Sequence, residues 1–377
     1  MKIINVVGAR PNFMKIAPII EAMRATEQIE SILVHTGQHY DEQMSDLFFR
    51  QLNIPKPDIN LEVGSASHSV QTAEIMMAFE PVVKEHKPDA VLVVGDVNST
   101  IACGLVAAKL GVKLIHVEAG LRSFDRSMPE EINRVLTDAI SDLLFCTEQS
   151  AVENLLREGA GKEKIFFVGN VMIDSLLKNI TFADKLNILD RLNLKEKGFI
   201  VLTLHRPSNV DNPAVLGRIL DAIEVIQQYM PVIFPIHPRT EHNMRTMELT
   251  ERLEKISNLK LIPPLGYLEF LKLLSGARLV MTDSGGIQEE TAVLKIPCLT
   301  VRENTERPVT VEVGSNVVAG TDPDKIIIAY RDLILRDLNN IPKPPLWDGH
   351  AAERIVGILL EKILPKNQVC EPAAANK

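Results

Sequence analysis

Short apolar runs rich in β-branched residues alternate with longer stretches of helical periodicity along almost the whole chain. In the first half the runs fall near residues 2–7, 31–36, 90–95, 113–118, 142–146 and 165–168. In the second half they fall near residues 199–204, 232–236, 259–262, 278–282, 297–300 and 316–318. Apolar strands that alternate with helices are typical of parallel sheets covered on both faces. The pattern therefore predicts an α/β protein with two doubly wound, Rossmann-like domains.

The length of the chain and the break in this alternation indicate where the domains divide. With 377 residues, the chain is long enough for two domains of about 150–200 residues each. The first alternation ends at Gly169 and Asn170, and a charged, mostly helical connection leads to the second. We expect an N-terminal domain over residues 1–169 and a C-terminal domain over residues 170–349. An amphipathic helix at about 350–363 follows and is free to return to the first domain.

The segment after the run at 278–282 has the chemistry of a phosphate site. Ser284 is a residue type that begins helices, and Gly285 and Gly286 lie where the helix would start. Free backbone N–H groups and the positive end of the helix dipole favour an anion there, and glycine allows a close approach. Glu290, one turn further, could accept hydrogen bonds from ribose hydroxyls. A tight strand-to-helix turn is the plainer interpretation, and these residues alone leave both open.

Two cations follow the first apolar run. Arg10 and Lys15 lie around the opening turn of a predicted helix. Cations beside free N–H groups suit a diphosphate, although two solvated side chains on a surface loop are the alternative. The segment has no GxGxxG motif, so the signature of a nicotinamide-type dinucleotide site is missing.

Carboxylates follow two neighbouring runs of the first domain, with Asp96 after the run at 90–95 and Glu118 ending the run at 113–118. Because parallel strands present their carboxyl ends at one ligand-binding edge, desolvation and mutual repulsion should raise the pKa of both acids and suit them to proton transfer. Glu131, at the start of a later helix, is a third candidate acid or base. A helix cap at Asp96 and an ordinary acidic first turn at Glu131 are the structural alternatives.

Histidines and an aromatic residue mark the corresponding edge of the second domain. His205 and Arg206 follow the run at 199–204, and His237 follows the next run. A lone histidine is usually structural, but we interpret His205, beside an arginine at this edge, as a ligand-binding or catalytic group. Further along, Tyr267 or Phe270 could stack on a base, although packing at a helix start explains an aromatic side chain equally well.

Composition excludes several classes of partner. The formal net charge of −8 offers no general attraction to nucleic acid or to anionic membranes. No export signal or run of 18 apolar residues is present, so we expect neither secretion nor a membrane span. The four cysteines are scattered, which fits reduced thiols in the cytoplasm, and the nine histidines show no spacing typical of metal ligands.

Seven short motifs resemble one family in their order and spacing. They are GARPNFMK at 8–15, GD at 95–96, HVEAGLRS at 116–123, PEEINR at 129–134, LHRPSNVDN at 204–212, TDSGGIQEE at 282–290 and TERP at 305–308. From residue 1 to about 363 the chain resembles the non-hydrolysing UDP-N-acetylglucosamine 2-epimerases. This resemblance implies the two-domain GT-B architecture of many glycosyltransferases, a UDP-sugar in the interdomain cleft, a homodimer, and no metal or nicotinamide cofactor.

The resemblance also assigns roles to individual residues. The diphosphate would be held by Arg10 of the N-terminal domain and by Ser284, Gly285 and Gly286 of the C-terminal, UDP-binding domain. Glu290 would hold the ribose, and Phe270 would lie beside the uracil. The sugar and the breaking bond would be surrounded by Lys15, Asp96, Glu118, Glu131, His205 and Arg307. UDP would leave by elimination across carbons 1 and 2 to give a glycal, and would then add back with carbon 2 inverted. Which carboxylate acts on which face stays open.

Many bacterial members of that family bind a second substrate molecule as an activator. The positions that resemble this second site are Gln43, Gln71, Arg206 and His237. The main hypothesis is therefore epimerisation of UDP-N-acetylglucosamine to UDP-N-acetylmannosamine for surface polysaccharide synthesis. Three alternatives stay open: a 2-epimerase of UDP-2,3-diacetamido glucuronic acid, a GT-B glycosyltransferase or hydrolysing epimerase, and a non-catalytic nucleotide-sugar sensor.

Overall fold

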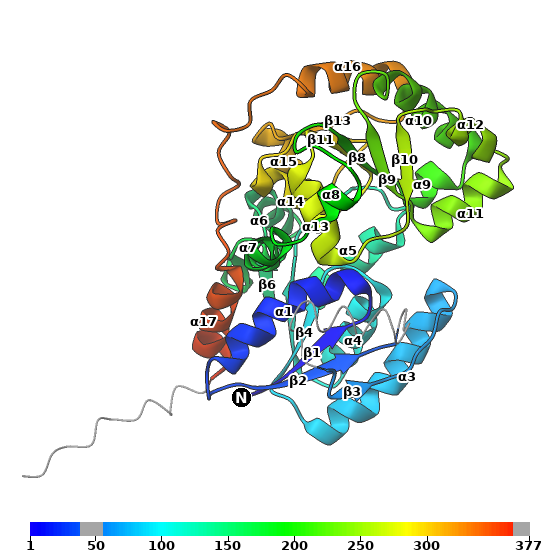
Figure 1. Ribbon diagram of the computed structural model, residues 1–377. Coiled ribbons are helices and arrows are strands. Elements are labelled where there is room, and N and C mark those ends of the chain that lie inside the picture. The colour runs from blue at the N-terminus through cyan, green and yellow to red at the C-terminus, as the bar shows by residue number, and fades with distance from the viewer. Residues whose placement is uncertain (38–55, 365–377) are drawn as a thin grey trace, which may run out of the picture.

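A computed structural model describes residues 1–37 and 56–364, which form two parallel sheets (Figure 1). The first sheet has seven strands in the order β3-β2-β1-β4-β5-β6-β7, and the second has six in the order β10-β9-β8-β11-β12-β13. In each sheet the chain changes direction across the sheet beside its first strand, between β1 and β4 and between β8 and β11. Such switch points are where open α/β sheets bind ligands. The predicted class, two doubly wound Rossmann-like sheets, is confirmed.

The strands coincide with the predicted apolar runs. Those of the first sheet are β1 (Lys2–Val7), β2 (Glu30–His35), β3 (Ile59–Asn60), β4 (Ala90–Val94), β5 (Lys113–Val117), β6 (Leu143–Cys146) and β7 (Ile165–Phe167). Those of the second are β8 (Ile200–Thr203), β9 (Val232–Pro235), β10 (Leu259–Ile262), β11 (Leu279–Thr282), β12 (Cys298–Thr300) and β13 (Asn316–Val318). Only β3 was not predicted, because two residues are too few to show a periodicity. It forms by pairing with β2.

Helices connect the strands and cover both sheets. In the first half they are α1 (Arg10–Arg24), α3 (His68–His86), α4 (Asn98–Lys109), α5 (Pro129–Ile140), α6 (Gln149–Arg157), the 3-10 helix η1 (Lys162–Lys164) and α7 (Val171–Ala183). In the second half they are α8 (Ile188–Arg191), α9 (Pro207–Val210), α10 (Pro213–Ile226), α11 (Pro238–Thr246), α12 (Thr250–Glu254), α13 (Tyr267–Gly276), α14 (Gly285–Leu294), α15 (Pro308–Glu312), α16 (Pro323–Leu333) and α17 (Ala351–Ile363). Many of them begin at proline, whose missing N–H is not needed in a first turn.

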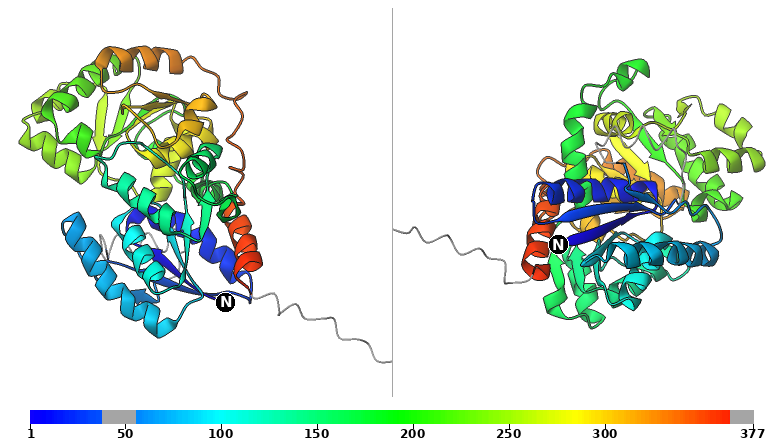
Figure 2. Two further views of the ribbon diagram at one scale, coloured as in Figure 1. Left: turned by 180° about the vertical axis from the view of Figure 1, so that it is seen from behind. Right: turned by 90° about the horizontal axis from the view of Figure 1, so that it is seen from below.

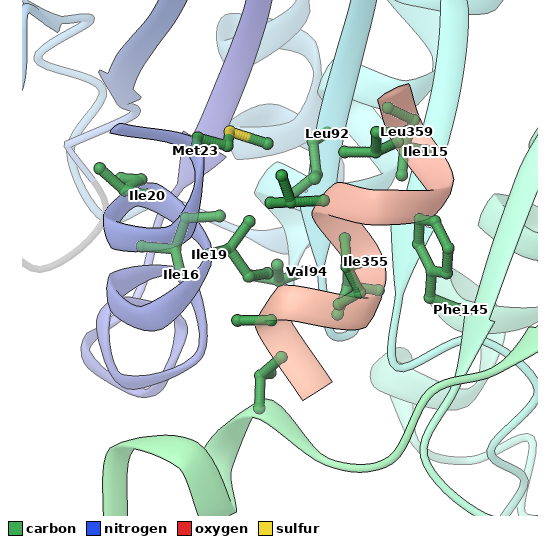
Figure 3. Close-up of a cluster of buried hydrophobic side chains, with 14 of the residues drawn as sticks. Ile16, Ile19, Ile20, Met23, Leu92, Val94, Ile115, Phe145, Ile355 and Leu359 are labelled. Carbon is green, nitrogen blue, oxygen red and sulfur yellow. The ribbon is translucent and has the colours of Figure 1, made fainter. Parts of the chain in front are cut away.

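The last helix packs on the first sheet rather than on the second. Ile355 and Leu359 of α17 are fully buried against apolar side chains of β4, β5 and α1 (Figure 3). Each such side chain contributes roughly 1.5–3 kcal/mol when it is removed from water. Figure 2 shows α17 beside α1 from two further directions. The C-terminal segment therefore completes the core of the N-terminal sheet.

Hydrogen bonds hold the start of α17 and the segment before it in place. Asp174 of α7 accepts hydrogen bonds from the backbone N–H groups of Ala351 (3.2 Å) and Ala352 (2.7 Å), at the start of α17. Trp347 is buried and donates its indole N–H to the carbonyl oxygen of Thr147 (2.9 Å). The segment before α17 is thereby tied to both α7 and the end of β6. Among the helices of the described residues, none is long and apolar enough to cross a membrane.

Candidate active site

Glu118 lies between two cations at the carboxyl end of β5. Its Oε2 pairs with the ammonium group of Lys15, from α1, and its Oε1 lies 3.6 Å from Nη2 of Arg307. The Glu118 side chain is almost completely buried. Its backbone has a left-handed φ of 69°, a conformation that costs about 1–3 kcal/mol in a residue other than glycine. The surrounding structure therefore holds Glu118 in one place at an energetic cost.

Arg307 joins the two halves of the molecule. It precedes α15 of the second half, and its Nε pairs with the carboxylate of Glu289 in α14. Its Nη2 faces Glu118 of the first half. Burial by itself would lower the pKa of the guanidinium, but the charges of Glu289 and Glu118 raise that pKa above its usual range. The positive charge of Arg307 thus lies between Glu118 of the first half and Glu289 of the second.

Asp96, at the carboxyl end of β4, pairs with a different cation. Its Oδ2 lies 2.5 Å from Nη2 of Arg134 in α5. Burial would raise the pKa of Asp96, but the positive charges of Arg134 and Lys15 outweigh it and lower the pKa. The expectation of a raised pKa at Asp96 is therefore wrong, because cations accompany the acids at this edge. The helix-cap alternative is also wrong, since Val97 is the N-cap of α4 and no side chain caps that helix.

Glu131 holds the loop that follows β5. One carboxylate oxygen accepts from the backbone N–H and the hydroxyl of Ser123, both at 2.9 Å, and the other accepts from the N–H of Phe124 at 2.9 Å. Nη1 of Arg134 lies 2.8 Å from the first oxygen. Glu131 therefore orients the same arginine that pairs with Asp96. Its role as an acid or base stays a prediction.

The ring of His205, after β8, is oriented by a carboxylate from the neighbouring strand. Its Nδ1 lies 2.8 Å from Oδ1 of Asp283, which is completely buried at the end of the neighbouring strand β11. Asp283 also accepts from the backbone N–H groups of His205 (3.0 Å) and Arg206 (2.9 Å). Burial would raise the pKa of Asp283, but these hydrogen bonds and the interaction with His205 lower it. Asp283 is thus an acceptor that fixes the His205 ring.

The two glycines at the start of α14 each have room for a methyl group. Ser284 is the N-cap residue, and its side chain makes no cap hydrogen bond. A Cβ atom at Gly285 would meet nothing closer than Oε2 of Glu306 at 3.8 Å, and one at Gly286 nothing closer than Cε of Met172 at 3.9 Å. Neither glycine has a positive φ. Since neither packing nor conformation requires glycine here, the close approach of a ligand is the better explanation of both.

Two further carboxyl groups titrate near neutral pH. Burial raises the pKa of Glu290, in α14, to about 7, and the Tyr267 hydroxyl lies 3.3 Å from its Oε1. Burial likewise raises the pKa of Glu148 to about 7, although Ser150 donates a hydrogen bond to it at 2.6 Å. Glu148 follows β6, beside the strand that carries Glu118. Sequence reasoning missed Glu148, and its place after a buried strand was the available signal.

The raised pKa of Glu290 makes stability depend on pH. A carboxyl group that titrates near 4.5 in the unfolded chain and near 7 in the folded one binds more protons when folded, so its contribution is full below pH 4.5 and is lost as the pH rises through 7. Between pH 5 and pH 7 we expect the wild type to lose about 2 kcal/mol that Glu290→Gln does not lose. Urea unfolding at several pH values measures this difference. Parallel profiles would contradict it, and Glu85→Gln, on the surface, is the control.

The remaining candidate residues lie on several different elements. Arg10 is the first residue of α1, Phe270 is half-buried in α13, and Gln43 lies outside the described residues. Gln71 is buried, where it accepts from Asn98 (2.8 Å). The ring of His237 lies 6.2 Å from that of His205, and Nη2 of Arg206 lies 3.7 Å from Oε1 of Glu306. Arg206 and His237 thus lie near His205, whereas Gln71 belongs to α3.

Comparison with known proteins decides which family the residues represent. The family model described as UDP-N-acetylglucosamine 2-epimerase matches residues 21–360. The chain belongs to the UDP-N-acetylglucosamine 2-epimerase family. This family was predicted from the motifs, and the prediction is confirmed.

Relatives within the UDP-N-acetylglucosamine 2-epimerase family align over nearly their whole length. The UDP-N-acetylglucosamine 2-epimerase of Methanocaldococcus jannaschii is 46% identical over 364 residues, which cover 95% of this chain and 99% of that protein. The crystal structure of the Methanocaldococcus jannaschii enzyme in complex with UDP-GlcNAc and UDP has a TM-score of 0.89 and covers 96% of this chain and 100% of that chain. The UDP-2,3-diacetamido-2,3-dideoxy-D-glucuronate 2-epimerase of Pseudomonas aeruginosa is 44% identical over 366 residues, 96% of this chain and 100% of that protein.

Proposed function

We propose that this chain reversibly converts UDP-N-acetylglucosamine to UDP-N-acetylmannosamine by inverting carbon 2. The observation that carries the proposal is Glu118, held between Lys15 of the first half and Arg307 of the second. The helix that pairs with Arg307 through Glu289 also begins with the turn at Gly285 and Gly286. A diphosphate on that turn would place the attached sugar toward the acids of the first sheet.

The charges fit an elimination and re-addition. Breaking the C1–O bond leaves negative charge on UDP, which the N–H groups at the start of α14 and nearby cations stabilise. A carboxylate removes the proton from carbon 2, and the double bond of a glycal forms between carbons 1 and 2. UDP then adds back to carbon 1 while a proton is delivered to the opposite face of carbon 2. Asp96, Glu118 and Glu131 are the candidate proton carriers, and the face on which each acts stays open.

Turnover in deuterium oxide tests this function. Epimerisation should place deuterium at carbon 2 of the recovered UDP-sugar, as seen by NMR. Unlabelled and unchanged substrate would contradict the proposal, and would leave a nucleotide-sugar sensor. Transfer to an acceptor would indicate a glycosyltransferase, and free N-acetylmannosamine with UDP would indicate a hydrolysing epimerase.

A second substrate is the main alternative. The 44% identity to the Pseudomonas aeruginosa enzyme favours UDP-2,3-diacetamido glucuronic acid as a candidate to be assayed beside UDP-N-acetylglucosamine. The substrate with the larger kcat/KM is the one whose sugar the site fits. A preference for the diacetamido sugar would change the substrate without changing the proposed chemistry.

The glycine turn gives a direct prediction for nucleotide binding. We expect Gly285→Ala and Gly286→Ala to weaken UDP binding about tenfold or more, because the added methyl group occupies the approach to the N–H groups. The free energy of unfolding should stay the same or rise by up to about 1 kcal/mol, since alanine favours a helix over glycine. Calorimetry and urea unfolding measure the two effects.

A matched control separates binding from helix propensity. A Cβ atom added at Gly357, in α17, would meet no other atom within 4 Å, so Gly357→Ala should gain stability without changing UDP affinity. If Gly285→Ala and Gly286→Ala both bind UDP as tightly as the wild type, the diphosphate does not bind at this turn.

We also propose the finer features that the resemblance implies. Exposed apolar side chains on α3 and α5 support a homodimer; they are Val70, Met77, Ile132, Val135 and Leu136. A second UDP-N-acetylglucosamine would act as an activator near Arg206, whose Nε is buried with no hydrogen-bond partner in the described residues. The enzyme would work in the cytoplasm and supply polysaccharide synthesis.

A further inference from the structure

A buried histidine–aspartate pair lies beside the two turns that carry the candidate acids. His116 of β5 and Asp138 of α5 are both buried, and Nδ1 of the histidine lies 2.6 Å from Oδ1 of the aspartate. Nη1 of Arg122 lies 2.7 Å from Oδ2 of Asp138, and Arg122 pairs in turn with Glu158. The cluster contains no group of the second sheet.

Each member of the pair is hydrogen-bonded to one of the two turns. Nε2 of His116 lies 2.8 Å from the carbonyl oxygen of Gly95, the residue immediately before Asp96. Oδ2 of Asp138 accepts a hydrogen bond of 3.0 Å from the backbone N–H of Gly120, two residues after Glu118. The pair therefore connects the end of β4 to the turn after β5.

The direction of these hydrogen bonds follows from the chemistry of the groups. A carbonyl oxygen only accepts, so Nε2 of His116 carries a hydrogen. Burial would raise the pKa of Asp138, but the interactions with His116 and Arg122 lower it, so the carboxylate is ionised and also accepts. Asp138 thus faces both the His116 ring and the backbone N–H of Gly120.

Both turns contain residues with left-handed backbone angles. Gly95, Glu118 and Gly120 all have left-handed φ angles, of 68°, 69° and 80°. A Cβ atom at Gly95 would lie 3.0 Å from Nζ of Lys15 and 3.3 Å from Oε2 of Glu118, so this backbone lies directly against the Lys15–Glu118 pair. A small shift of either turn would move the carboxylates relative to each other.

We propose that His116 and Asp138 are positioning residues that hold Asp96 and Glu118 in the geometry required for proton transfer at carbon 2. The inference rests on the proposed function. It assigns to the pair an effect on the chemical step, transmitted through the backbone at Gly95 and Gly120, rather than on nucleotide binding.

Two substitutions test the proposal. In Asp138→Asn only one atom of the amide can accept, so the contacts with His116 and with the Gly120 N–H are not both kept. In His116→Gln a flexible amide replaces the ring, so the contacts with Asp138 and the Gly95 carbonyl are not both kept. We expect kcat to fall about 100-fold in each, the cost of misplacing reacting groups by about 1 Å. KM and the affinity for UDP should change little, because the glycine turn of α14 lies in the second half of the molecule.

Asp174→Asn is the matched control. Asp174 is also buried and accepts from two backbone N–H groups, but those belong to Ala351 and Ala352 rather than to the acid-bearing turns. It should lower the unfolding temperature, as Asp138→Asn does, while kcat stays near that of the wild type. If Asp138→Asn does not fold, His116→Gln carries the test.

The outcomes distinguish this inference from the proposed function. Folded His116→Gln or Asp138→Asn with the kcat of the wild type would overturn the positioning role. A loss of UDP affinity equal to the loss of kcat would also overturn it, because a general structural change would then explain both. A wild-type protein that does not exchange the hydrogen at carbon 2 would instead contradict the proposed function.

Discussion

Replacing Glu118 with glutamine is expected to lower kcat about 1,000-fold and to remove hydrogen exchange at carbon 2, within the usual range for losing a general acid or base. The amide keeps the size of the side chain but can neither accept a proton nor balance the charges of Lys15 and Arg307, which flank it. UDP should still bind, since the proposed diphosphate seat lies on α14. Steady-state kinetics and NMR in deuterium oxide measure both effects.

Glu153→Gln provides the comparison for this experiment. Glu153 is an exposed carboxylate on α6, so its replacement should leave kcat unchanged. If Glu118→Gln keeps a kcat within about tenfold of the wild type, Glu118 does not transfer the proton and its strained, buried position needs another explanation.

The second large effect is expected at Arg307. Arg307→Leu should lower the free energy of unfolding by about 3–5 kcal/mol, the usual result of removing one member of a buried ion pair. The reason is Glu289: burial raises its pKa, Arg307 opposes that increase, and the variant would leave its carboxylate without this partner. The variant should also lose kcat, because the cation beside Glu118 is gone.

A double variant shows whether the unpaired charge causes the loss. In Arg307→Leu with Glu289→Gln, neither charge remains, so part of the lost stability should return. Urea unfolding of the two single variants and the double variant gives the coupling energy. Additive losses would show that Arg307 and Glu289 do not stabilise each other, in conflict with the ion pair that joins them.

Sequence patterns predicted the architecture because they depend on local properties. Every predicted apolar run forms a strand, with ends that differ by at most one residue, since β-branched runs between turns report burial directly. The same reasoning placed Asp96 and Glu118 after neighbouring strands, and β4 and β5 pair in parallel. Adjacent parallel strands thus bring these two acids to the same edge of the sheet.

The electrostatic details could not be predicted, because they depend on residues far apart in the chain. The charge that lowers the pKa of Asp96 comes first from Arg134, which is 38 residues away, and the carboxylate that orients His205 is Asp283, which is 78 residues away. Residue types singled out Asp96 and His205 as candidates, but not the partners that they meet in the structure. Only the packing of α5 on the first sheet and the pairing of β8 with β11 determine which groups meet.

A crystal structure with UDP bound tests the central claim, that one sheet holds the diphosphate while the other supplies acids to the hexose. The diphosphate should lie on the backbone N–H groups of Ser284, Gly285 and Gly286, with the terminal phosphate directed toward Glu118. A nucleotide bound elsewhere, or a Glu118 carboxylate that faces away from the sugar position, would contradict the account.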